Sequence, residues 1–216
     1  MSPSKSPSAS PSASPSGGQS WDMEDDFNRS NEDPPTGWIE DVGTAWAIVS
    51  NQLVDGNPNY NRIRYNGSFS QTYRQYAKVK VVTLTDDDGW AGIMLRATST
   101  QCYIMQIISA TTANVALEDG TPVLGTAALG SKTVNNGDYI GFEVENTGNS
   151  TYFRLWCWDT TDPGDRTAWG TADREGTCSA GLCTYDTNAG GGLYGGYGTP
   201  DTTYDDFKAS SSSDAP

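Results

Sequence analysis

Residues 77–96, AKVKVVTLTDDDGWAGIMLR, decide the fold class. In the first half Ala77, Val79 and Val81 alternate with polar residues, and in the second half apolar residues again occupy every second position. A period of two residues is typical of a β-strand with one buried face. The acidic DDDG stretch at 86–89 separates the two halves, so the pattern predicts two strands joined as a hairpin.

The same alternation continues over about 190 residues, and no stretch shows a sustained helical period. Turn-forming Gly, Asn and Asp residues cut it into short segments, and the chain carries 24 Gly, 7 Trp, 11 Tyr and 5 Phe, as strands joined by tight turns require. Further strands are predicted at residues 102–108, 115–118, 139–145, 152–158 and 192–197. We therefore predict an all-β fold, a sandwich of two antiparallel sheets.

The two ends of the chain differ from this region. Residues 2–16 have Ser at every even position and Pro at 3, 7, 11 and 15, which predicts a disordered tether over 1–20, a sandwich over 21–210 and a frayed tail over 211–216. The N-terminal 20 residues lack the apolar core of a signal peptide. No apolar stretch approaches the roughly 20 residues that cross a bilayer, so we expect no membrane insertion.

Composition excludes several functions. With 13 Lys and Arg against 27 Asp and Glu, the formal net charge of −14 disfavours nucleic acid as a partner. The chain has no His, so histidine-based triads, His metal sites and imidazole proton shuttles are excluded.

One strand carries an unusual set of side chains. Over residues 152–158 (YFRLWCW), strand parity turns Phe153, Leu155 and Cys157 to one face. The residues on the other face are Tyr152, Arg154, Trp156 and Trp158. A solvated strand rarely displays three aromatic rings and a guanidinium, and sugar rings stack on such planes. The alternative is that these rings are core residues or lie beneath long loops.

Three residues of neighbouring segments could extend this surface. Trp90, Arg96 and Tyr103 lie on predicted strands and would add a ring and hydrogen-bond donors. We therefore predict a ligand-binding surface made by these three together with Tyr152, Arg154, Trp156 and Trp158.

Several motifs occur in a recognisable order. They are Asp25-Asp26-Phe27 followed by Asn28-Arg29, then GIMLR at 92–96, YIMQI at 103–107, DYIGFEV at 138–144 and a second Asp-Asp-Phe at 205–207. In this order the chain, over roughly residues 21–210, resembles the concanavalin A-like lectin/glucanase superfamily, and most closely its laminin-G-like and sugar-binding jelly-roll members. The resemblance implies a two-sheet jelly roll with neighbouring first and last strands, a curved sheet that often binds glycans, and frequently a structural calcium.

Acidic residues allow two further sites. If the terminal strands pair, Asp25, Asp26, Asp205 and Asp206 come close together, and such oxygen clusters suit Ca²⁺. The alternative is that water screens these charges.

Glycoside cleavage needs two carboxyl groups roughly 5 to 10 Å apart, and Glu143 and Glu145 project from one side of a predicted strand. The E-x-D-x-x-E string of the glucanases is absent, and so is the His of the lyases in this superfamily. We expect these two glutamates to form a solvated strand face, and we expect no catalysis.

Four cysteines allow three pairings. Cys178 with Cys183 would close a short loop, and Cys102 with Cys157 would join two strands, as suits an oxidising setting. Cys157 as a small buried hydrophobe is the alternative.

We therefore expect a non-catalytic carbohydrate-binding or adhesion module that binds surface glycan or polysaccharide. Its location would be extracellular or the surface of a virion, for example a phage appendage. The alternatives are a structural protein that contacts other subunits of a larger assembly through its aromatic face, and a glycoside hydrolase with an unrecognised carboxylate pair.

Overall fold

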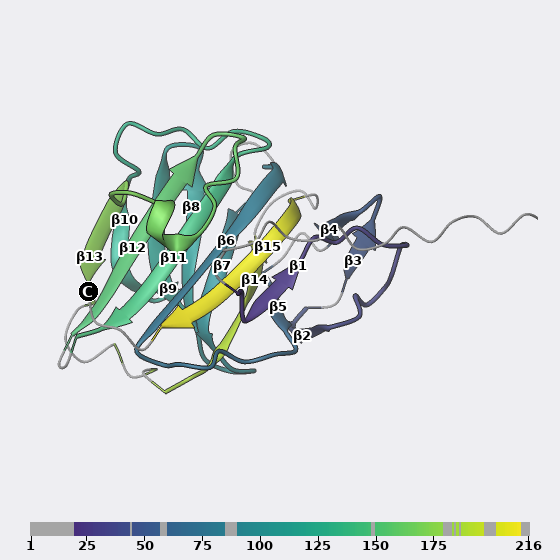
Figure 1. The fold of residues 1–216 in the computed structure, drawn as a ribbon, viewed down its shortest axis with the longest axis horizontal. Helices are drawn as coiled ribbons and strands as arrows, with labels where there is room; N and C mark the ends of the chain where they lie inside the picture. Colours follow the sequence, from purple (N-terminus) through teal and green to yellow (C-terminus); the bar gives the residue numbers. More distant parts are fainter. Residues whose placement is uncertain are drawn as a thin grey trace, which may run out of the picture.

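The computed structural model describes residues 20–212, except 44, 57–59, 85–89, 148–149, 179–182, 184, 186 and 197–201. Two antiparallel sheets lie face to face, and the described residues contain no α-helix (Figure 1). The all-β sandwich is therefore confirmed. The predicted tether falls on residues outside the described part of the chain, apart from Ser20.

The first sheet, sheet A, has eight strands among the described residues. They are β1 (Met23–Asp25), β3 (Trp46–Val49), β4 (Gln52–Asp55), β6 (Arg74–Thr83), β11 (Tyr139–Asn146), β12 (Thr151–Trp158), β13 (Arg174–Thr177) and β15 (Thr203–Ser212). Their order is β13-β12-β11-β6-β15-β4-β3, and β1 pairs with β15. The first and last strands are thus neighbours, as the resemblance implied.

The second sheet, sheet B, has seven strands in the described regions. They are β2 (Trp38–Val42), β5 (Asn61–Tyr65), β7 (Trp90–Ala97), β8 (Tyr103–Ser109), β9 (Thr112–Leu117), β10 (Pro122–Ala128) and β14 (Gly190–Gly196), in the order β10-β9-β8-β7-β14-β5-β2. A short 3-10 helix, η1 (Arg166–Ala168), lies between β12 and β13.

The core between the sheets follows from the alternation in the sequence. On β6, Ala77, Val79 and Val81 point inward and are fully buried, and on β7 Ile93 and Leu95 do the same. Apolar side chains at every second position therefore build one continuous core, and we call the face of each sheet that points away from this core its outer face.

The predicted hairpin of residues 77–96 is wrong. β6 pairs with β11 and β15 in sheet A, whereas β7 pairs with β8 and β14 in sheet B. Both strands alternate correctly, but alternation fixes only which side chains face the core. It is the same for two strands paired in one sheet and for two strands that face each other across the sandwich.

The C-terminal boundary lies two residues later than predicted. β15 continues to Ser212, and the hydroxyl of Ser211 lies 2.7 Å from the Asp22 carboxylate and accepts the backbone N–H of Gln71 at 3.0 Å. These bonds hold the end of the last strand against the first segment of the domain. Residues 213–216 lie outside the described residues.

Candidate functional site

The candidate site lies on the outer face of sheet A, on β12, β11 and β6. Strand parity on β12 is as predicted: Phe153, Leu155 and Cys157 are buried in the core between the sheets. Arg154 and Trp156 belong to the opposite set, and Trp156 forms a separate apolar cluster with Tyr76 and Trp169. The side chains singled out in the sequence therefore do project from the outer face.

The segment 159–173, which carries η1, lies across this face in front of β11 and β12 (Figure 1). The ring of Trp169 packs edge-on against Trp156, with centroids 5.2 Å apart, and against Trp158, at 5.0 Å. Trp156 also donates its indole N–H to the carbonyl of Gly170 at 3.3 Å and is only 1% exposed. The expectation that Trp156 is exposed is therefore wrong, because this segment covers its ring.

Trp158 is partly exposed and is held in a defined position. Its ring lies nearly parallel to that of Trp156, at an interplanar angle of 6°. Beneath it, a Cβ added to Gly141 of β11 would come within 2.6 Å of the indole. The missing side chain of Gly141 thus allows Trp158 to lie flat on the sheet. Tyr152, at the other end of β12, is also partly exposed.

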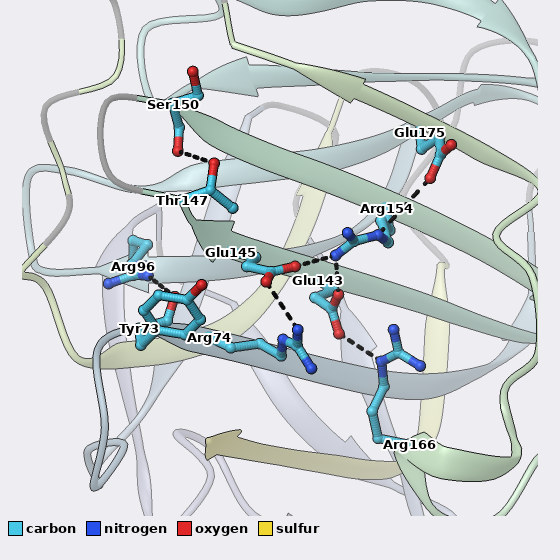
Figure 2. Close-up of polar contacts among 10 residues, drawn as sticks. All are labelled: Tyr73, Arg74, Arg96, Glu143, Glu145, Thr147, Ser150, Arg154, Arg166 and Glu175. Atoms are coloured by element: carbon cyan, nitrogen blue, oxygen red, sulfur yellow. Dashed lines mark hydrogen bonds and ion pairs between the residues drawn. The ribbon is translucent and has the colours of Figure 1, made fainter. Parts of the chain in front are cut away.

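The two glutamates of β11 are not a solvated strand face. Glu143 and Glu145 are fully buried, and Arg154 of β12 donates through Nη1 to both, at 2.6 Å to Glu143 (Figure 2). Arg74 reaches Glu145 at 2.8 Å, and Arg166 of η1 donates to Glu143. The expectation of solvated glutamates is wrong because three guanidiniums and the 159–173 segment surround them.

This network explains the titration of Glu145. Burial alone would raise its pKa, but the hydrogen bonds from Arg154 and Arg74 outweigh burial, so the pKa lies below its ordinary value. Glu145 is therefore held as a carboxylate. That state suits a structural anchor and not a general acid, which needs a raised pKa.

A second ion pair holds the 159–173 segment. Lys78 of β6, which is 1% exposed, donates to the Asp162 carboxylate and, at 2.8 Å, to the Gly164 carbonyl. Burial lowers the pKa of Lys78, and the bond from Lys78 lowers the pKa of Asp162 although partial burial acts in the opposite direction. The ion pair favours both charges, but the buried Lys78 bears a greater desolvation cost than the exposed Asp162.

Trp90, Arg96 and Tyr103 do not extend the β12 surface. They belong to β7 and β8 of sheet B, so this prediction is wrong. Tyr103 points into the core against Phe153, with ring centroids 5.1 Å apart. Arg96 is buried and donates to the Tyr73 carbonyl (Figure 2). The side chain of Trp90 lies outside the described residues.

The acidic residues of the paired terminal strands are partly committed to other contacts. Asp25 accepts bonds from the guanidinium of Arg29 at 2.6 Å and the indole N–H of Trp38 at 2.8 Å. Asp206 accepts the hydroxyl of Tyr139 at 2.7 Å. No group of three or more potential metal ligands occurs among the described residues. Calcium at Asp25, Asp26, Asp205 and Asp206 stays a prediction from the sequence.

The cysteines divide into one bonded pair and two buried thiols. Cys178 and Cys183 form the predicted disulfide. The Cys102–Cys157 bond is not formed: Cys102 contacts Arg62 in sheet B, whereas Cys157 lies on β12 and points into the core. Burial raises the pKa of each free thiol to about 12, so both are inert small hydrophobes.

Sequence reasoning missed the residues that cover and frame the site. Arg166, Trp169 and Asp162 lie in a loop with no alternation, and Arg74 and Lys78 read as ordinary outward-facing strand residues. The Asp162-Pro163-Gly164 turn indicates only that the chain reverses direction after β12. Nothing in it predicts that the chain then returns over the strand.

Comparisons with known proteins agree with the fold. No protein-family model matches the chain, and no curated protein matches it significantly. Three similar solved structures are the carbohydrate-binding module CBM66 from Bacillus subtilis (12% identity, TM-score 0.51, 82% of this chain and 96% of that chain), the carbohydrate recognition domain of Emp47p (11%, 0.51, 91% and 98%) and a beta-1,3-glucanase from Mycobacterium marinum (11%, 0.50, 90% and 100%). Identity this low shows the fold alone, and that fold is the two-sheet antiparallel sandwich that the sequence predicted.

Proposed function

We propose that this chain, which folds as a concanavalin A-like sandwich, is a carbohydrate-binding module and that its glycan binds on the outer face of sheet A. One observation carries this proposal: on β12, a strand fixed in the sandwich, the partly exposed rings of Tyr152 and Trp158 lie on the same face as Arg154, Tyr152 next to it and Trp158 beyond the covered Trp156. Rigid aromatic planes beside a fixed donor suit sugar rings, which offer C–H faces and hydroxyl groups. The structural neighbours include carbohydrate-binding and carbohydrate-recognition domains, which supports the proposal.

Arg154 is held in place before any ligand arrives. Two buried carboxylates accept from its Nη1, and its Cζ lies 6.0 Å from the Tyr152 ring centroid. Such fixation lowers the entropy lost on binding, since the donor is already oriented.

The test is binding to a glycan array by the folded protein and two variants. Trp158→Ala and Tyr152→Ala should each lower the signal at least tenfold, because each removes a stacking plane. Tyr60→Ala is the matched control, since Tyr60 is a half-exposed aromatic residue that packs on Tyr194 of sheet B. Trp156→Ala is unsuitable because that ring is buried. Unchanged binding by Trp158→Ala would reject this site.

We propose binding in place of hydrolysis because the paired carboxylates of β11 are occupied by guanidiniums and the pKa of Glu145 is lowered. A glycosidase acid needs the opposite shift. Release of reducing sugar from a bound glycan, abolished by Glu143→Gln in a protein that still folds, would contradict this choice.

We further propose that the module acts outside a cell, on a cell or virion surface. The Cys178–Cys183 disulfide fits an oxidising compartment. Among the described residues, no helix has the length and apolar character to span a membrane. A copurifying protein partner, together with no glycan signal, would instead favour a structural role in a larger assembly.

A further inference from the structure

The guanidiniums on the outer face of sheet A outnumber the buried carboxylates that they contact. Arg74, Arg154 and Arg166 surround Glu143 and Glu145, as Figure 2 shows. With the exposed carboxylate of Glu175, which lies 3.8 Å from Nε of Arg154, three positive charges face three negative charges, so this group is balanced although the whole chain has a formal net charge of −14. This region is therefore less acidic than the protein as a whole.

Most N–H donors of these arginines are not used by the two glutamates. Arg154 contacts Glu143 and Glu145 through Nη1, and Arg166 donates to Glu143 through Nε while its Cζ lies 4.5 Å from the ring centroid of Trp156. Arg74 donates through Nη2. The side chains of Arg154 and Arg166 are 23% and 21% exposed, so solvent reaches part of each, whereas Nε of Arg74 is buried. The carboxylates beneath them are at most 1% exposed and cannot be reached.

A ligand between Arg154 and Arg166 therefore meets guanidinium donors whose buried carboxylate partners it cannot reach, with the exposed Glu175 at the edge. Neutral sugar hydroxyls both donate and accept, whereas a carboxylate only accepts and pairs with guanidinium through charge-assisted bonds. From this chemistry, and resting on the proposed function, we infer that the glycan carries a carboxylate-bearing sugar that binds between Arg154 and Arg166.

The net charge limits the form of this glycan. A chain of −14 repels a dense polyanion at long range, but at physiological salt such repulsion is screened beyond about 8–10 Å, so contact with the arginines dominates for one acidic residue. We therefore expect recognition of isolated or terminal acidic sugars.

One acidic residue at the edge of the surface competes with the ligand. The Glu175 carboxylate of β13 lies 3.8 Å from Nε of Arg154, and its side chain is 70% exposed. Its removal should strengthen binding of an acidic sugar, whereas a purely structural ion pair would leave binding unchanged or weaker.

The experiment is an array that carries each acidic oligosaccharide beside its neutral counterpart: oligogalacturonates beside their methyl esters, sialyllactose beside lactose, and glucuronic-acid-bearing xylo-oligosaccharides beside plain ones. Binding of at least one acidic member tenfold more tightly than its neutral counterpart supports the inference. Equal binding of every pair overturns it and leaves the proposed function intact. Binding of no member overturns both.

Isothermal titration with the best acidic oligosaccharide then tests the residues. Glu175→Gln should tighten binding about threefold, and Arg166→Lys, which keeps the charge and loses the planar fork, should weaken it about tenfold. Glu24→Gln is the matched control: it changes the net charge equally but lies on β1, five strands from β13 and roughly 24 Å away by strand spacing. Equal tightening by Glu24→Gln and Glu175→Gln would overturn the proposed contact.

Discussion

The outer faces of the two sheets differ in how they bury the side chains that point away from the core. On sheet B, Met94, Ile104 and Tyr194 form an apolar cluster with Cys102. On sheet A, Lys78 of β6 and Glu143 and Glu145 of β11 point away from the core and are buried, and the partly exposed Arg154 of β12 pairs with both glutamates. Side chains are thus buried on both outer faces, by apolar packing on sheet B and by ion pairs and packed rings on sheet A.

The difference matters because the two kinds of burial lose different amounts of stability when one side chain is removed. An apolar cluster loses packing when one member is removed. A buried ion network leaves an uncompensated charge when one member is removed, which costs more, although the intact network contributes little net stability. The ion network of sheet A adds little stability and is costly to disturb. It lies on the face that we propose for ligand binding, where charges in fixed positions can orient a ligand.

The largest expected effect is loss of the central arginine of sheet A. Arg154→Ala should lower the free energy of unfolding by about 3 kcal/mol, because Glu143 and Glu145 stay buried with only Arg166 and Arg74 as partners. Arg62→Ala, at a buried arginine of sheet B that donates to the Cys102 sulfur and the Ser99 carbonyl, should cost about 1 kcal/mol. Urea denaturation of both variants measures the difference.

Equal costs for Arg154→Ala and Arg62→Ala would show that the carboxylates of sheet A are not desolvated as described. The two outer faces would then not differ in the way proposed here.

The second effect concerns Gly141, whose missing side chain allows the Trp158 ring to lie flat on sheet A. Gly141→Ala should cost about 2 kcal/mol, because its Cβ would overlap the indole and overpacking must be relieved by moving the ring. The same change should weaken glycan binding, since Trp158 is displaced. Gly125→Ala on β10 of sheet B is the matched control, because a Cβ there meets nothing within 4 Å. Thermal unfolding and array binding of both variants test this, and an unaltered Trp158 environment in Gly141→Ala would contradict it.

The sequence predicted the strands better than their partners. Alternation at Ala77, Val79 and Val81 identifies a strand and its buried face because burial depends on each side chain locally. It could not show that β6 and β7 lie in different sheets, since pairing depends on contacts between distant segments. The continuous apolar runs of β7 and β8 did contain a signal that both faces are buried, and that signal is absent from β6.

The candidate site was predicted only in part, because it too depends on contacts between segments that are distant in the sequence. Parity placed Arg154 and Trp156 on one face correctly, but exposure depends on what covers that face. The covering residues, Trp169 and Arg166, lie in a segment without a regular period. Charged residues such as Glu143 read as solvated unless the guanidiniums that pair with them are known, and those come from β6, β12 and η1.

A third effect is the pH dependence of the ion network. The pKa of Glu145 is lowered in the folded state, so the unfolded chain binds more protons in the window just below the ordinary value of 4.5. The stability from this group is complete above 4.5 and is lost as the pH falls through the lower folded-state pKa. Urea titrations between pH 7 and 3 should show this loss. Glu145→Gln should reduce the slope below pH 4.5, and an unchanged slope would argue against the network.

The smallest effect is the pH-dependent stability contributed by Asp205 on β15, which differs in sign from that of the ion network on the same sheet. Asp205 on β15 has a raised pKa, because burial and the neighbouring charge of Asp206 both disfavour its carboxylate. The sign is therefore opposite to that of Glu145: stability is highest below the ordinary value of 3.8 and is lost as the pH rises through the folded-state pKa. Asp205→Asn should stabilise the protein at pH 7 by less than about 1 kcal/mol and have no effect near pH 3. Its amide oxygen can still accept the Asp206 N–H, which Asp205 accepts at 2.9 Å. Destabilisation at pH 7 would mean that the Asp205 charge is matched by a cation, and its reversal by a chelator would identify that cation as the calcium that the sequence predicts here.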